Sequence, residues 1–214
     1  MIEALPIDRR RVIVLAAAAL LTPVGADAAE GDPAKAQAVV NRLHETLLTV
    51  MKQAGALKYA GRAALLAPVV QVAFDMPVMA RLVIGTGWQA LPSEQQNRFV
   101  DVFTRFTIAT YANRFDGWSG ESFETLPDVL PQQSALMVQT RLNRTDGQPP
   151  VALNYLLRAD REGNWRIIDV YLSGTISELA TRRADYSMIL KRDGIDKLIE
   201  TIDGRIKVLA TTQT

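Results

Sequence analysis

The 214-residue sequence contains no cysteine, which excludes disulfides, thiolate catalysis and thiolate metal sites. It contains a single histidine, His44. The pair His44-Glu45 therefore lacks the second histidine of a zinc-protease helix, and the position four residues later is Leu48. We predict that His44 is an exposed helical residue. The formal net charge is only +1, so the chain has no general attraction to nucleic acid.

Complete glycine-based motifs are also missing. Gly85-Thr86-Gly87 lacks the third glycine of a dinucleotide fingerprint and follows a helical pattern instead of a strand, so we interpret it as a plain turn. The segment Gly117-Trp-Ser-Gly120 lacks the spacing of a nucleophile elbow, and His44 lies in a different predicted element. The sequence therefore offers no complete catalytic set.

No hydrophobic run near the start is long enough for a permanent membrane span. The apolar segment Val12–Leu21 is about half of the roughly 20 residues that cross a bilayer. Arg9-Arg10-Arg11 precede it, and Ala26-Asp27-Ala28 supplies a small-x-small cleavage pattern. We predict a secretory signal peptide over residues 1–28, cleaved near Ala28 after Sec or twin-arginine export, with an uncleaved anchor as the alternative. Residues 29–214 are then one exported domain.

The remaining sequence divides into helical patterns, then strands, then helical patterns again. Asp32-Pro33 is typical of a helix start, and Ser93 with Gln96 forms a capping-box pattern. Helices are predicted over a first segment beginning at Pro33 and over Gly61–Val72, Asp75–Ile84, Ser93–Phe115, Thr175–Leu190 and Ile195–Leu209. Alternating apolar residues predict strands over Leu136–Leu142, Val151–Leu157 and Trp165–Leu172, with a fourth near Ser122–Leu126. We interpret Asp116–Gln133 as an acidic surface connection.

This segregated order predicts an α+β fold in which helices pack on the concave face of a curved antiparallel sheet. We expect three to four strands in a meander and about six to seven helices.

Two long blocks of sequence resemble one known family. The block Phe74–Phe115 contains Phe-Asp, Met-x-Arg, Gly-x-x-Trp and Gln-Gln-x-Arg-Phe elements ahead of the longest predicted helix. The block "IIDVYLSGTISELATRRADYSMILKRDGIDKLIE", residues 167–200, contains Asp169-Val170 and Gly194-Ile-Asp196. Both are similar to the MlaC family of periplasmic phospholipid-binding proteins. The sequence of Tyr171–Ser187 resembles that of the hopanoid-associated, HpnM-like branch of the family.

The resemblance implies a cone-shaped, NTF2-like fold around an apolar cavity, with no enzymatic activity and no cofactor or metal. It implies a lipid carrier between the inner and outer membranes, with hopanoid or phospholipid as cargo. Its expected partners are an inner-membrane transporter of the resistance-nodulation-division or Mla type and, transiently, the membrane surface. From the facing patterns, the expected lipid-binding residues are Phe99, Phe103, Phe106, Tyr111, Val138, Leu153, Tyr155, Val170, Leu172 and Ile176. Arg81, Arg182 or Arg183 are candidates for contact with an anionic head group.

Asp169 supports an alternative function, because a carboxylate inside an apolar strand can have a raised pKa and act as a base. Tyr155 or Tyr171 would then donate a hydrogen bond in a small isomerase-like or hydrolytic enzyme. Strict alternation places Asp169 on the strand face of Trp165 and Ile167, where a structural pairing with Tyr or Arg is the competing interpretation. A periplasmic adaptor without lipid is the third hypothesis.

Overall fold

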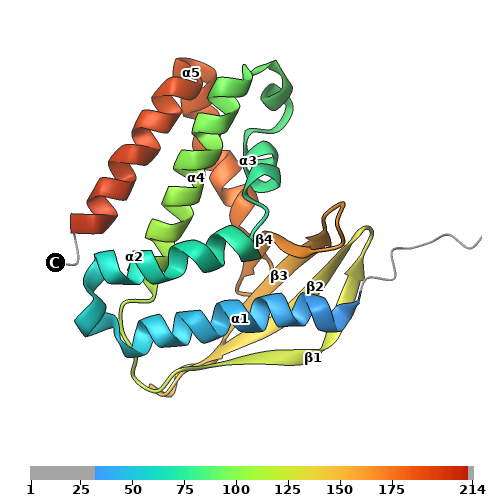
Figure 1. The fold of residues 1–214 in the computed structure, drawn as a ribbon, viewed down its shortest axis with the longest axis vertical. Coiled ribbons are helices and arrows are strands. Elements are labelled where there is room, and N and C mark those ends of the chain that lie inside the picture. Colours follow the sequence, from blue (N-terminus) through green and yellow to red (C-terminus); the bar gives the residue numbers. More distant parts are fainter. Residues whose placement is uncertain (1–31, 212–214) are drawn as a thin grey trace, which may run out of the picture.

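The fold is built around an antiparallel sheet whose strands follow one another in sequence order (Figure 1). The structure is a computed structural model and describes residues 32–211. Its five strands in the described part are β1 (Ser122–Gln132), β2 (Ala135–Asn143), β3 (Val151–Ala159), β4 (Trp165–Leu172) and β5 (Ile176–Ser177). Each is antiparallel to the next. The predicted meander is confirmed, with one strand more than the three to four expected.

The helices lie before and after the sheet in the chain. They are α1 (Pro33–Lys52), α2 (Ala54–Ala73), α3 (Met76–Ile84), the 3-10 helix η1 (Gly85–Ala90), α4 (Ser93–Arg114) and α5 (Glu178–Thr211). Helix α1 lies across the sheet, whereas α4 and α5 extend away from it, with the two halves of α5 at an angle (Figure 1). Gly194, with φ 80° and ψ −178°, divides α5 at the predicted boundary between two helices. Residues 32–211 thus contain five α-helices, slightly fewer than the six to seven helices predicted, and one 3-10 helix.

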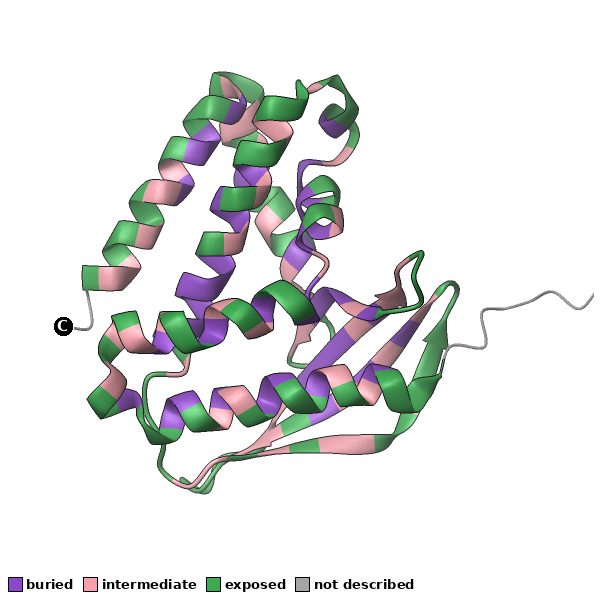
Figure 2. Cartoon of the chain, in the orientation of Figure 1, coloured by how far each residue is buried: buried purple, intermediate pink, exposed green. Residues whose placement is uncertain are grey.

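The core forms where the apolar stripe of α1 packs on the sheet and that of α4 packs against α2, α3 and α5. Helical spacing predicts these stripes, and Figure 2 shows buried residues along both helices and along the central strands. The fully buried members include Val40, Leu43, Leu47, Phe99, Phe103, Val138, Leu157 and Ile167. Each such side chain contributes about 1.5–3 kcal/mol through removal from water. This core fixes the position of α4, which forms one wall of the cavity described below.

His44 is buried, so its prediction as an exposed residue is wrong. Only 4% of its surface is exposed. Its Nε2 lies 3.0 Å from the Tyr155 hydroxyl, and its ring stacks on Phe123 with 4.1 Å between centroids. The cause is helical geometry: His44 lies four residues after Val40 and three before Leu47, on the face of α1 that packs on the sheet.

Most of the predicted acidic connection Asp116–Gln133 is strand β1, which is longer than the expected Ser122–Leu126. A bulge explains why the alternation is hidden, because Thr125 pairs with Thr140 but the next pair is Val129 with Val138. Pro127 has no amide hydrogen for the ladder and lies in this bulge.

The predicted cap of one helix and the predicted start of another also need correction, although α4 begins at Ser93 as expected. Pro92, with no side-chain hydrogen bond, is the N-cap of α4. The Gln96 side chain donates to the carbonyls of Trp88 (2.9 Å) and Leu91 (3.0 Å), instead of forming a capping box with Ser93. Helix α5 begins at Glu178, later than the predicted Thr175, because the chain first turns back to form the short β5.

Candidate functional site

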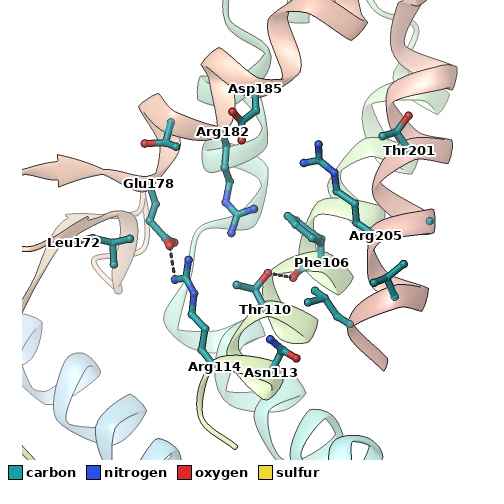
Figure 3. A pocket seen from close by; sticks show the side chains of 14 residues that line it. Phe106, Thr110, Asn113, Arg114, Leu172, Glu178, Arg182, Asp185, Thr201 and Arg205 are labelled. Carbon is teal, nitrogen blue, oxygen red and sulfur yellow. Dashed lines mark hydrogen bonds and ion pairs between the residues drawn. The ribbon is translucent and has the colours of Figure 1, made fainter. Parts of the chain in front are cut away.

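A cavity of about 750 Å³ lies between α4, the two halves of α5 and the end of β4 (Figure 3). Its size is within the range of about 300–1,000 Å³ that is typical of small-molecule sites. Its lining consists of Phe106, Thr110, Asn113, Arg114, Leu172, Glu178, Thr181, Arg182, Asp185, Thr201, Gly204, Arg205, Val208 and Leu209. Apolar and charged side chains therefore line the same open cavity.

The apolar part of the lining comes from three elements. Phe106 of α4 forms one wall, Leu172 ends β4, and Val208 and Leu209 come from the last turns of α5. Val208 is 64% exposed, a high value for an aliphatic side chain, and it is exposed toward this space. Binding of an apolar ligand is favourable at such a surface, because the ligand displaces water from it.

An ion pair connects α4 with the start of α5 at one side of the cavity. Arg114 Nη1 lies 2.5 Å from Glu178 Oε1 (Figure 3). The Glu178 side chain is only 13% exposed, whereas that of Arg114 is 45% exposed. The pair neutralises the Glu178 carboxylate, whereas an unpaired charge there would oppose the entry of an apolar or anionic ligand.

Arg182 has a different partner. Its guanidinium carbon lies 4.7 Å from the ring centroid of Phe106 and 6.0 Å from that of Phe103. These are cation–π contacts, which hold the guanidinium above an aromatic wall without neutralising its charge. Arg205 approaches the same space from the second half of α5 (Figure 3). Of the other two candidate arginines, Arg183 packs against Gly85 and Arg81 lies at a separate surface depression.

Asp169 holds the start of α5 in place and is outside the cavity lining. Its Oδ2 accepts a hydrogen bond from the Ser177 hydroxyl (2.6 Å), and its Oδ1 accepts from the amides of Val170 (2.7 Å) and Leu179 (3.2 Å). Burial raises the pKa of Asp169, and these hydrogen bonds oppose the rise. The structural pairing is confirmed, although its partners are a serine and backbone amides instead of Tyr or Arg.

A second bulge changes the face on which Asp169 was expected. Leu156 pairs with Asp169 but Leu157 pairs with Ile167, so Ile168 is the extra residue. Ile167 and Val170 consequently both belong to the core cluster, whereas Ile168 does not. Strict alternation along β4 was therefore wrong.

The structure separates the ten predicted lipid-binding residues into three groups. Phe106 and Leu172 line the cavity. Ile176 is 55% exposed on β5. The other seven are buried in the core, namely Phe99, Phe103, Tyr111, Val138, Leu153, Tyr155 and Val170.

The sequence interpretation missed the wall formed by the second half of α5. Thr201, Gly204, Arg205 and Val208 follow the spacing i, i+3, i+4, i+7 and share one helix face. A glycine and an aliphatic residue on a face that does not belong to the core were the available signal. We call these four residues the cavity face of α5.

Two further searches of the described residues gave negative results. Residues 32–211 contain no cluster of three or more histidine and acidic side chains that could hold a metal ion. Over the same range, no helix combines the length and apolar character needed to cross a membrane. The predicted signal peptide lies outside the described residues.

Comparisons with known proteins found one matching family and a solved structure of similar fold. Residues 41–203, most of the chain, match the family of the MlaC protein. No curated protein matches the sequence. The fold is similar to that of a phospholipid-binding protein from Ralstonia solanacearum, solved in complex with a phospholipid, with a TM-score of 0.67 and 24% identity over 82% of this chain and 99% of that one. The length of the family match decides the assignment: this chain belongs to the MlaC family.

Proposed function

We propose that this protein is a periplasmic lipid carrier that binds a phospholipid or hopanoid in the cavity between α4 and α5. The observation that supports this most directly is the partly apolar cavity, open to solvent, in a chain of the MlaC family. The phospholipid bound to the Ralstonia solanacearum protein of similar fold adds support. The proposed role is to move lipid between the inner and outer membranes.

Lipid transfer through water needs such a cavity. A diacyl lipid has on the order of thirty methylenes, and exposing them to water costs roughly 0.8 kcal/mol each. A carrier must offer apolar surface comparable to a bilayer, because a much better solvent would never release the lipid. We propose that Phe106 and Leu172, together with Val208 and Leu209, contact the acyl chains. The other predicted lining residues would contact lipid after the core opens, except Ile176, which is at the surface.

We propose binding without catalysis. Two polar contacts of Asp169, with Ser177 and the Leu179 amide, fix the start of α5, and the third is with the adjacent Val170 amide on β4. Asp169 does not line the cavity. The Tyr155 hydroxyl, the donor in the enzyme hypothesis, is engaged with His44. The Asp169→Asn variant is therefore expected to retain lipid binding.

The export signal and the partners complete the proposal. A signal peptide over residues 1–28 would deliver the domain to the periplasm. There it would dock transiently on a membrane and on an inner-membrane transporter of the resistance-nodulation-division or Mla type. The surfaces to test are the acidic segment 116–133 and the basic stretch Arg182-Arg183.

The decisive experiment combines lipid extraction with a variant that fills the cavity. Gly204 lines the cavity, and a side chain built there meets nothing within 4 Å, so Gly204→Phe should project a ring into open space. The matched control is Lys207→Phe, which adds the same ring at an exposed position outside the lining.

Protein purified from a hopanoid-making periplasm should yield stoichiometric lipid in mass spectra of organic extracts. Gly204→Phe should reduce that yield at least tenfold, and Lys207→Phe should not. If wild-type protein yields no lipid and binds no labelled lipid, the carrier function is wrong. The identity of the extracted lipid separates hopanoid from phospholipid.

A further inference from the structure

The charge balance of the cavity is uneven. Its lining contains three arginines, Arg114, Arg182 and Arg205, and two acidic residues, Glu178 and Asp185. Arg114 and Glu178 neutralise each other. Neither Arg182 nor Arg205 lies within ion-pair distance of a carboxylate among residues 32–211, and the exposed Asp185 pairs with neither. Two guanidinium groups therefore remain available to a ligand.

The two arginines approach the same region from different helices. Arg182 extends from the first half of α5 and Arg205 from the second half into the space between them (Figure 3). Both are close enough to the buried Tyr186 hydroxyl to lower its pKa against the effect of burial. The bend at Gly194 brings them together, although they lie far apart along one helix in sequence.

Arg182 is also pre-positioned for an anion. Its stacking over Phe106 and Phe103 restricts the side chain while leaving its N–H groups free of any carboxylate. A guanidinium offers a fork of donors that matches the oxygens of a phosphate. Phe106 belongs to the apolar lining at the same time, so an apolar surface and a cationic donor lie side by side. An amphiphile with an anionic head fits both.

We propose that Arg182 and Arg205 bind the phosphodiester head group of the cargo, so that the cavity selects an anionic phospholipid over a neutral lipid. This inference rests on the proposed carrier function and narrows its substrate class. It also disfavours a hopanoid without an acidic group, since such a lipid would leave both guanidinium groups unpaired. Free phosphate compounds share the head-group chemistry but lack the acyl chains that the apolar lining accommodates.

The test compares two lipids that differ only in the phosphodiester. Full-length mature protein is equilibrated with micelles of a neutral detergent containing dioleoyl phosphatidylglycerol or dioleoylglycerol, and bound lipid is measured by native mass spectrometry. The readout is the affinity ratio of the two lipids. Wild-type protein should prefer phosphatidylglycerol by at least about tenfold, because charge-assisted hydrogen bonds to two arginines are gained. The preference should fall as salt is raised, since Arg205 is exposed.

The variants assign the preference to these residues. Arg182→Gln and Arg205→Gln should each lower the ratio several-fold, and the double variant should bring it close to one. Arg205→Gln is informative even if Arg182→Gln folds poorly, because Arg205 is exposed and, among residues 32–211, has no cation–π contact such as that of Arg182. Arg192→Gln is the matched control: it makes the same charge change on α5, at an exposed arginine paired with Asp193 outside the cavity.

The outcomes separate the two proposals. If neither lipid binds, the carrier function itself fails. If both lipids bind equally, or if the double variant keeps the preference, the carrier function stands and the head-group assignment is wrong. If soluble glycerol phosphate binds as tightly as phosphatidylglycerol, the site recognises a free phosphate compound and the lipid head-group assignment is overturned.

Discussion

The single histidine makes the acid sensitivity of this fold unusually simple to test. His44 is buried between α1 and the sheet, and burial lowers its pKa from 6.5 to about 4. Within residues 32–211 no carboxylate is paired with the ring, whose contacts there include the Tyr155 side chain and the Phe123 ring. The folded state therefore holds neutral His44, while the unfolded chain protonates it near pH 6.5.

The sign and size of the effect follow from linkage. Because the pKa is lower in the folded state, the unfolded state binds more protons at acidic pH. The stability contributed by neutral His44 is fully present above pH 6.5 and is lost as pH falls toward 4. The full shift corresponds to about 3 kcal/mol, of which about 2 kcal/mol is lost between about pH 7.5 and pH 5. For a domain of this size, that loss lowers the Tm by about 4–8 °C.

The assay is urea denaturation at a series of pH values, comparing wild-type protein with His44→Gln. Glutamine can still hydrogen-bond to Tyr155 but takes up no proton in this range, so the variant should show a flatter dependence of unfolding free energy on pH. Its lower overall stability does not matter, because the readout is the slope. Asp169 and all other carboxylates are present in both proteins and cancel in the comparison. Equal slopes between pH 7.5 and pH 5 would refute the assignment of acid sensitivity to His44.

Three further predictions concern the elements that position the cavity, and each is checked by chemical denaturation. Gly85→Ala should destabilise the protein by about 1–3 kcal/mol, because φ is 74° and the added Cβ would lie 2.6 Å from Arg183 Nη2. Adding Arg183→Ala should recover only the part of the lost stability that is due to the clash, and not the part that is due to the positive φ. Ile202→Ala should cost about 2–5 kcal/mol, since the side chain is fully buried, and a loss under 1 kcal/mol would contradict its place in the core. Asp169→Ala should cost about 1–3 kcal/mol, because it leaves the buried Leu179 amide without its acceptor, and Asp169→Asn should cost less.

The helical half of the fold could be predicted because its buried faces repeat at helical spacing. Phe99, Phe103 and Phe106 on α4 are the clearest case, and all three are buried. His44 was misplaced because its residue type was given more weight than its position, although the same spacing puts it beside Leu43 and Leu47 on α1. Position on a periodic face was the stronger signal.

The strands were harder to predict because two bulges interrupt their alternation. Period-two patterns lose their phase at an extra residue. Pro127 marks the bulge before Val129, whereas the bulge at Ile168 has no marker in composition alone. The cavity was harder still. Its α5 face consists of a threonine, a glycine, an arginine and a valine, which is the composition of an ordinary solvated face. The bend at Gly194 turns that face toward α4 and makes it part of the cavity lining.

The second half of α5 therefore uses two faces for two purposes. One face, with Ile195, Leu198, Ile199 and Ile202, is buried and stabilises the fold. The cavity face, with Thr201, Gly204, Arg205 and Val208, is exposed or half-buried. Substitutions on an exposed face usually change stability by no more than about 0.5 kcal/mol, whereas truncations in the core cost several times more. Lipid contacts along the cavity face can consequently change with little loss of stability, and a variant such as Gly204→Phe tests binding without testing folding at the same time.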